Sequence, residues 1–465
     1  MNCLIALASI FLVLRRCCTL PVQPAVDEPR EQLETEPVSV IVPCYLPNEQ
    51  TIIESTIRHI LTKLEWKGRV TLFVVYNTPA PLPFEAKLRE LDGREFAPGR
   101  ILRVVNAEGS TSKAQNLNLV LPRVQDDYVA LYDADHHPDV SSLRLLMTTL
   151  AQRRKCVAVQ GSTYIRNARA SVLAHLVDAE FFVTHFVYFP AMEVLAASGY
   201  FGGSNALWRT AVLSRYAFDD AMLTEDVDVS ARALLDGHTI TFCPEARSGE
   251  LSPAGTRALV QQRLRWFMGW EQVTTRYYWK VFWTGLPLHR KMGFCYLFHL
   301  RWLLLLAAVL AAVINPVLTS PLVYPLTTWS LPIQICVYVA VSLYAFVALL
   351  GLSHALKHEW RRPWAIVSLI VFFLFGWLYV ILHFATHTVA FIKVFTGSTG
   401  KWEVTTRSIK GISPQVAPMA SAQEIRSASG SEPSLFGWRS NVAVPGSSLP
   451  PLAEPLLDAA ERAAA

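Results

Sequence analysis

The alternation of short apolar runs with helical stretches constrains the fold of this chain more than any other feature. Residues 38–42 form an apolar run that stops at Pro43, which predicts a buried strand, and residues 51–64 follow with the apolar spacing of a helix. Further predicted strands, with helical stretches between them, cover residues 70–76, 101–105 and 128–132. Strands that alternate with helices predict an α/β domain whose mostly parallel sheet is covered on both faces.

The chain changes character after residue 285. Apolar runs at residues 294–316, 331–352 and 364–384 are each near the ~20 residues that a helix needs to cross a bilayer. Hydrophobic residues make up 52% of the 465 residues and charged residues 17%, a balance that favours membrane spans beside a soluble domain. The basic stretch 357–362 is expected on the cytosolic side, and residues 385–395 are expected to lie along the membrane interface.

These patterns divide the chain into four predicted parts. They are a short hydrophobic anchor and linker (1–36), the α/β domain with an interfacial helix (37–285), transmembrane helices (286–395), and a cytosolic-type motif with a disordered tail (396–465). Three full spans would place the tail outside the cell, whereas its first basic residues favour the inside, so the number of spans stays open.

Charge and cysteine usage argue against nucleic-acid binding, a disulfide framework and a zinc site. The net charge is +5, and no stripe of basic residues interleaved with aromatics is present, so nucleic-acid binding is not expected. The eight cysteines are scattered and form no CxxC pair, which predicts neither a disulfide framework nor a zinc site.

Two carboxylates follow the predicted strand at residues 128–132. Asp133 and Asp135 stand at positions i and i+2, where side chains can face the same side. Together they form a partial site for a hard divalent ion that also binds phosphate oxygens. The alternative is a solvated turn that leads into a helix.

A second acidic motif, Thr224-Glu225-Asp226, has the pattern of a helix start. Thr224 is a good N-cap, acids are favoured in a first turn, and Gly237 ends the predicted helix. A carboxylate held at a helix start on the rim of a cleft can also accept a proton from a hydroxyl group. The structural and the chemical interpretations are compatible.

A third motif places Gln262, Arg265 and Trp266 on one helical face. An indole offers a flat surface to the C–H face of a sugar ring, and Arg and Gln can bond phosphate oxygens and hydroxyls. The alternative is a helix at the membrane interface, where tryptophans form a belt. The tryptophans expected in such a belt are Trp270, Trp279 and Trp283.

Taken in order, the three motifs resemble the catalytic domain of glycosyltransferase family 2, which includes cellulose, chitin, mannan and hyaluronan synthases. The resemblance covers residues 38–270, about half of the chain. It is also carried by residues 40–43 with Asn48 and Glu49, Lys113 with residues 114–118, Pro138, Gln160-Gly161, Gly203-Ser204-Asn205, and Trp402 with Thr405 and Arg407.

The resemblance implies a GT-A fold followed by an α-helical transmembrane region, and an inverting displacement on a nucleotide-sugar, commonly a UDP-sugar. By this resemblance Asp133 and Asp135 would hold Mg²⁺ or Mn²⁺, and Asp226, beside Glu225, would be the catalytic base. The implied nucleotide-sugar-binding residues are Glu49, Asn77, Lys113, Asp133, Gln262 and Arg265. The implied acceptor-binding residues are Gly203, Ser204, Asn205 and Trp266. Many members carry an Asp where this chain has Asn77, so the donor nucleotide and sugar stay open.

The first expectation for function is a metal-dependent hexosyltransferase that extends a β-linked polysaccharide, such as a cell-wall polymer. The protein would be a multi-pass membrane protein of the plasma membrane or Golgi, with its catalytic domain facing the cytosol. The alternative is a single-addition enzyme that makes a glycolipid, because three or four spans are few for a polymer channel. A non-catalytic membrane scaffold or transporter is expected least, since the apolar runs lack the buried charges of a substrate path.

Overall fold

The computed structural model describes residues 33–153, 155–300, 362–397 and 405–407, with isolated positions between 302 and 353. The predicted anchor before residue 33, most of the apolar runs 294–316 and 331–352, and the tail after residue 407 lie outside the described residues.

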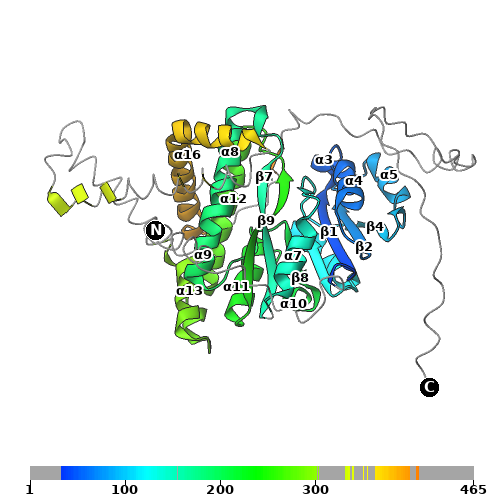
Figure 1. Ribbon diagram of the computed structural model, residues 1–465, viewed down its shortest axis with the longest axis horizontal. Helices are drawn as coiled ribbons and strands as arrows, with labels where there is room; N and C mark the ends of the chain where they lie inside the picture. Colours follow the sequence, from blue (N-terminus) through cyan, green and yellow to red (C-terminus); the bar gives the residue numbers. More distant parts are fainter. Residues whose placement is uncertain are drawn as a thin grey trace, which may run out of the picture. The chain divides into compact units, whose positions relative to one another are not determined.

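A nine-stranded sheet forms the centre of the described chain, in the order β3-β4-β2-β1-β5-β8-β7-β9-β6 (Figure 1). The strands are β1 (Val38–Tyr45), β2 (Val70–Asn77), β3 (Glu95–Ala97), β4 (Arg100–Asn106), β5 (Tyr128–Leu131), β6 (His137–Pro138), β7 (Cys156–Ile165), β8 (Ala206–Arg209) and β9 (Thr239–Glu250). The predicted strands correspond to β1, β2, β4 and β5, and these four are mutually parallel.

The sheet is mixed, and the prediction of a mostly parallel sheet holds for six of its nine strands, β1, β2, β4, β5, β7 and β9, which run in one direction. β8 runs antiparallel to both β5 and β7, and β3 and β6 also pair antiparallel at the two edges. β7 and β9 are parallel to each other. The direction of β8 depends on the path of the helices that precede it, which the apolar pattern of a four-residue strand does not encode.

Helices cover both faces of the sheet, because successive side chains of the buried strands point to opposite sides. In β1, Val40 and Val42 pack in the core formed with α4, α5 and α7, whereas Ile41 packs in the core formed with α6, α10 and α11. The bounds of these helices are α4 (Ile53–Lys63), α5 (Phe84–Glu90), α7 (Ser142–Ala151), α6 (Lys113–Val120), α10 (Thr210–Tyr216) and α11 (Glu225–Leu235).

A second group of helices packs beside the β7–β9 half of the sheet. A bent helical stretch runs through α8 (Val172–Val183), the π-helix η3 (Thr184–Tyr188) and α9 (Phe189–Ala196). The other members are α12 (Thr256–Tyr277), α13 (Leu288–Phe298) and α16 (Pro363–Phe395). α16 lies against α8 and α12, and the buried side chains between them form one apolar cluster (Figure 1).

Two helical segments of the described chain have the length and composition of membrane spans. One is Val172–Ala196; the other is α16, whose arms Pro363–Gly376 and Ile381–Phe395 meet at 71°. The predicted span 364–384 and interfacial segment 385–395 are therefore parts of one helix, and its bend lies before residue 385. These segments do not establish the predicted multi-pass topology, because core helices of soluble domains meet the same criteria.

Candidate active site

A cavity of about 340 Å³ opens beyond the carboxyl ends of β1, β2 and β5. Ligands of sheets with parallel strands gather at such ends. The predicted site residues that line the cavity are Glu49, Asn77, Lys113, Asp133, Asp135, Gly203, Ser204, Glu225, Asp226, Gln262, Arg265 and Trp266. The fold thus brings three motifs that are far apart in the sequence into one place.

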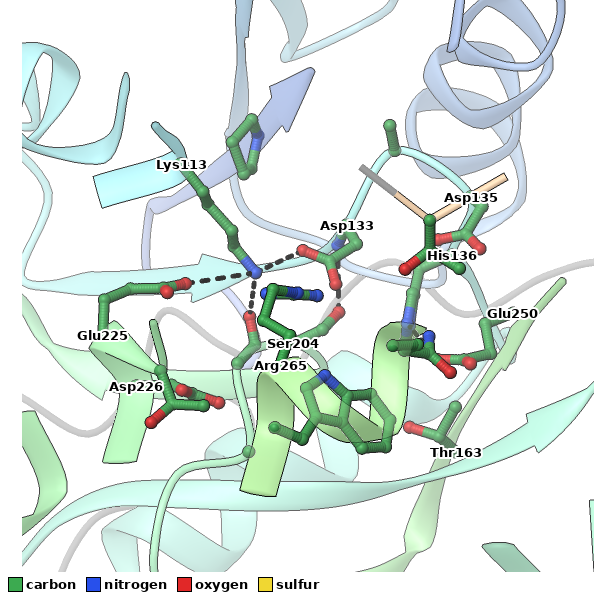
Figure 2. Close-up of a pocket in the computed structure, with 18 of the residues that line it drawn as sticks. Lys113, Asp133, Asp135, His136, Thr163, Ser204, Glu225, Asp226, Glu250 and Arg265 are labelled. Atoms are coloured by element: carbon green, nitrogen blue, oxygen red, sulfur yellow. Dashed lines mark hydrogen bonds and ion pairs between the residues drawn. The ribbon is translucent and has the colours of Figure 1, made fainter. Parts of the chain in front are cut away.

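Lys113 joins two of these motifs. It opens α6 behind the N-cap Ser112, and its Nζ donates to Asp133 Oδ1 at 2.5 Å and to the Gly203 carbonyl at 2.8 Å (Figure 2). The same Nζ lies 3.8 Å from Glu225 Oε1. Burial lowers the pKa of Lys113, but the facing Asp133 and Glu225 carboxylates outweigh it and raise the pKa above its ordinary value. The Lys113 ammonium group therefore lies between the Asp133 and Glu225 carboxylates.

Asp133 and Asp135 follow β5 and are held by separate partners. The Asp133 amide donates to Ser204 Oγ at 2.9 Å, and Asp135 Oδ2 accepts from the Leu251 amide at 3.2 Å. Burial raises the pKa of Asp133, yet Lys113 outweighs it and keeps the pKa below its ordinary value. Asp133 is therefore ionised at neutral pH, as a metal ligand must be.

The two carboxylates fit a divalent ion that shares its coordination with a substrate. No group of three or more ligating side chains occurs among the described residues. Mg²⁺ is commonly bound by one or two carboxylates together with phosphate oxygens and waters. The pair Asp133 and Asp135 matches that donor set and does not match an all-protein cage.

Asp226 lies in the first turn of α11, as predicted, and its carboxyl group faces the turn at Gly203. Gly203 has φ +88°, and a Cβ at this position would stand 2.8 Å from Asp226 Oδ2. Only glycine allows the turn to approach the carboxyl group so closely. Burial, and then the neighbouring Glu225 charge, raise the pKa of Asp226 to about 7.

Thr224 occupies the N-cap position of α11, but its side chain makes no capping hydrogen bond. Gly269 of α12 packs against it: a Cβ on Gly269 would stand 2.4 Å from Thr224 Oγ1. The helix therefore begins where the sequence predicts, but Thr224 Oγ1 is buried against α12 without a hydrogen-bond partner among the described residues, so the predicted cap is absent.

The turn at residues 202–205 is held by hydrogen bonds with the side chain of Gln160. Its Nε2 donates to the Ser204 carbonyl at 2.9 Å, and its Oε1 accepts from the Gly202 amide at 2.8 Å. Asn205, with φ +49°, donates from Nδ2 to the carbonyls of Ser162 and Ala246. Asn205 is not among the residues that line the cavity. The predicted acceptor contact of its side chain is therefore replaced by a role in holding the turn.

Gln262, Arg265 and Trp266 face the cavity from α12, as their helical spacing predicts. Nε of Arg265 is buried and has no hydrogen-bond partner among the described residues. Burial lowers the pKa of Arg265, although Glu225 and Asp226 oppose that change. A buried guanidinium group with an unpaired donor is suited to an anionic ligand.

Aromatic side chains form another part of the cavity wall, and no sequence motif predicted them. They come from α8, η3 and α9 and from the following loop, and comprise Phe181, His185, Phe189 and Tyr200. Trp270 also lines the cavity and packs edge-on against Tyr200 with ring centroids 5.1 Å apart. The prediction that Trp270 belongs to an exposed belt is therefore wrong, whereas Trp279 and Trp283 are 69% and 87% exposed.

Glu49 and Asn77 differ in the hydrogen bonds that their side chains already make within the protein. Glu49 Oε2 accepts from the Tyr45 amide at 2.8 Å, and burial, followed by the Asp135 charge, raises the pKa of Glu49 to about 8. Asn77 donates to the Ser110 carbonyl at 2.9 Å and accepts from Asn116 at 2.8 Å. The amide that stands in place of the common acid therefore ties the end of β2 to α6 and to the loop before it.

The short segment 405–407 closes one side of the cavity. Arg407 Nε lies 3.1 Å from Asp135 Oδ2, its Nη1 lies 3.7 Å from Glu250 Oε1, and its backbone pairs with Pro253. Glu250 also lies 3.1 Å from His136 Nε2. Glu250 was missed because its contacts with His136 and Arg407 join residues more than a hundred positions apart.

Comparison with known families agrees with this geometry. A family model described as glycosyltransferase like family 2 matches residues 36–269, half of the chain. The chain belongs to this family. Family membership confirms the resemblance drawn from the motifs and agrees with the GT-A-like α/β fold around the mixed sheet.

Among curated family 2 relatives, a probable glycosyltransferase of Bacillus subtilis is 24% identical over 250 residues, which cover 53% of this chain and 59% of the relative. The poly-β-1,6-N-acetyl-D-glucosamine synthase of Staphylococcus aureus is 26% identical over 244 residues, which cover 52% of this chain and 57% of the relative. The chain thus spans less than two thirds of the length of these relatives.

Solved structures resemble the chain more distantly. A mannosyltransferase from Pyrobaculum calidifontis, in complex with GDP-mannose and Mn²⁺, is 19% identical with a TM-score of 0.47, and the match covers 84% of this chain and 99% of that one. A glucosyl-3-phosphoglycerate synthase from Mycobacterium tuberculosis is 16% identical with a TM-score of 0.36, and the match covers 56% and 85%.

Proposed function

We propose that this family 2 protein is a membrane-bound, inverting hexosyltransferase that moves a sugar from a nucleotide-sugar to a growing β-linked polysaccharide. One observation carries the proposal: a single cavity holds a carboxylate pair, a separate carboxyl group with a pKa of about 7, and an indole. These are the parts needed to hold a diphosphate, to deprotonate a hydroxyl and to seat a sugar ring.

The donor diphosphate would lie at the end of the cavity that carries Asp133 and Asp135. These carboxylates would hold Mg²⁺ or Mn²⁺, which supplies positive charge to the leaving nucleotide. Arg265, with its unpaired Nε, and Lys113 would bond the phosphate oxygens. Glu49 and Asn77 would border the nucleoside, since both line the cavity near the ends of β1 and β2.

The acceptor would lie at the end formed by α12 and the aromatic wall. Asp226 would take the proton of the attacking hydroxyl, because a pKa of about 7 suits a base at neutral pH. Trp266 would stack the sugar ring, and Gln262 would bond a hydroxyl or a phosphate oxygen. Direct attack by the hydroxyl inverts the donor anomeric centre without a covalent intermediate.

A bilayer would border the acceptor end. Trp279 and Trp283 are exposed just beyond α12, and Phe373 and Ile381 of α16 are 73% and 58% exposed. Tryptophan beside apolar helices is typical of a membrane interface. The catalytic domain would then face the cytosol, where nucleotide-sugars are made.

The polysaccharide product is preferred to a glycolipid because a curated relative is named for the synthesis of a polysaccharide. Incubation of the full chain with labelled nucleotide-sugar and Mn²⁺, followed by sizing of the product, separates the two. We expect a ladder of lengthening oligosaccharides. A single labelled species that partitions into organic solvent would contradict polymer synthesis and support the glycolipid alternative.

A further inference from the structure

Arg263 lies between two residues that face the cavity, but it does not face the cavity itself. It is 1% exposed, and its Nη2 pairs with Glu180 Oε2 at 2.6 Å. Its guanidinium carbon lies 4.1 Å from the centroid of the Trp266 ring, and its Nη1 donates to Gln262 Oε1 at 3.1 Å. One buried cation therefore contacts two of the three side chains that α12 presents to the cavity.

These contacts restrict how the two side chains can be used. A guanidinium group over an indole is attracted to the ring face and fixes its orientation. Because Arg263 covers one face of Trp266, the other face is left for the cavity. Because the Gln262 oxygen accepts from Arg263, the orientation of the amide is fixed, and its nitrogen can donate to a ligand.

Glu180, the partner of Arg263, is held in turn by α16. The Tyr379 hydroxyl donates to Glu180 Oε2 at 2.7 Å, and Tyr379 is 4% exposed. His383 Nδ1 lies 3.9 Å from Glu180 Oε1. A continuous chain of polar contacts thus leads from the helix with the composition of a membrane span to the cavity, through Tyr379, Glu180 and Arg263.

We propose that Tyr379, Glu180 and Arg263 form a positioning clasp, which sets Trp266 and Gln262 for the acceptor and makes acceptor binding depend on the contact between Tyr379 of α16 and Glu180. The inference rests on the proposed function in that it takes Trp266 as the acceptor platform. Arg263 and Tyr379 do not line the cavity, whereas Glu180 does. All three are positioning residues and take no part in the displacement. The donor end of the cavity, at Asp133 and Asp135, does not touch the clasp.

Tyr379→Phe tests the clasp, because it removes one hydrogen bond to a charged group and keeps the ring. Ser368→Ala is a matched control: Ser368 also lies on α16 and donates to a buried acid of α8, Asp178, at 2.9 Å, but it contacts neither Arg263 nor Glu180. Full-length variants in detergent are compared with UDP-N-acetylglucosamine as donor and a β-linked N-acetylglucosamine tetramer as acceptor.

We expect Tyr379→Phe to raise the acceptor KM roughly tenfold, the loss of one hydrogen bond to a charged partner. The rate of donor hydrolysis without acceptor should change less than about twofold in Tyr379→Phe. In Ser368→Ala, both the acceptor KM and this hydrolysis rate should stay within about twofold of the wild type. An unchanged acceptor KM in Tyr379→Phe, or an equal rise in Ser368→Ala, would overturn the clasp.

A second readout does not depend on turnover. In protein labelled with 5-fluorotryptophan, the fluorine resonance of residue 266 is assigned from its loss in Trp266→Phe. We expect Tyr379→Phe to shift or broaden this resonance and Ser368→Ala to leave it in place. An unchanged resonance in Tyr379→Phe would refute the clasp. Absence of turnover in the wild type with every UDP- and GDP-sugar tested would instead refute the proposed function, while the resonance still decides the clasp.

Discussion

Replacing Asp226 by Asn is expected to lower the rate of sugar transfer by roughly 10²–10⁴-fold, the range for loss of a general base. The amide keeps the shape of the side chain but cannot accept the hydroxyl proton. Binding of the nucleotide-sugar, measured by calorimetry, should remain, since the donor would be held at the other end of the cavity. Asp220→Asn, at an exposed acid that accepts from Gln115, is the matched control.

The pH profile of the wild type is the companion to this variant. Because the pKa of Asp226 is raised to about 7, its basic form is depleted below that pH and gained above it. We expect kcat/KM to rise with pH through about 7 and to level off above it, and the residual rate of Asp226→Asn to lack this step. Full transfer by Asp226→Asn, or the same step in that variant, would contradict the role of Asp226.

Replacing Asp135 by Asn is expected to remove the dependence of donor binding on Mn²⁺ and to lower transfer by ~10³-fold, since a metal ion contributes several kcal/mol at a developing charge. Donor affinity is titrated with Mn²⁺ and again with EDTA. In the wild type, EDTA should weaken binding to the level of the variant.

Asp139→Asn controls for a change of charge near the same strand end. Asp139 accepts from the Tyr164 hydroxyl at 2.9 Å and is not among the residues that line the cavity. Donor binding by the Asp139→Asn variant should still depend on Mn²⁺. Thermal unfolding of both variants separates a loss of metal binding from a loss of fold, because Asp135 also pairs with Arg407. An Asp135→Asn enzyme that still responds to Mn²⁺ would contradict the metal site.

Local patterns predicted much of the donor half of the domain. The apolar runs of β1, β2 and β5 are buried on both faces, and this is the pattern that marks a parallel strand in a sequence. The three motifs were also predictable, because their spacing determines which side chains share a strand end or a helix face. Their convergence on one cavity followed from the family resemblance, not from spacing.

The remainder depends on contacts that no local pattern encodes. The antiparallel entry of β8 is set by the path of α8 and α9, and the aromatic wall exists because those helices fold back over the cavity. Asn205 looked like a ligand but is buried beneath its own turn. Arg263 was assigned no role from the sequence, because its partner Glu180 lies 83 residues away.

The central claim is that this cavity transfers sugar from a nucleotide-sugar with the help of a divalent ion. The most direct measurement is nucleotide release by the full chain in detergent across a panel of labelled UDP- and GDP-sugars, with Mn²⁺ and with EDTA. We expect one donor to be consumed and its label to enter a larger product. EDTA should stop both the consumption and the labelling. Consumption of none of the donors, or equal consumption in EDTA, would contradict it.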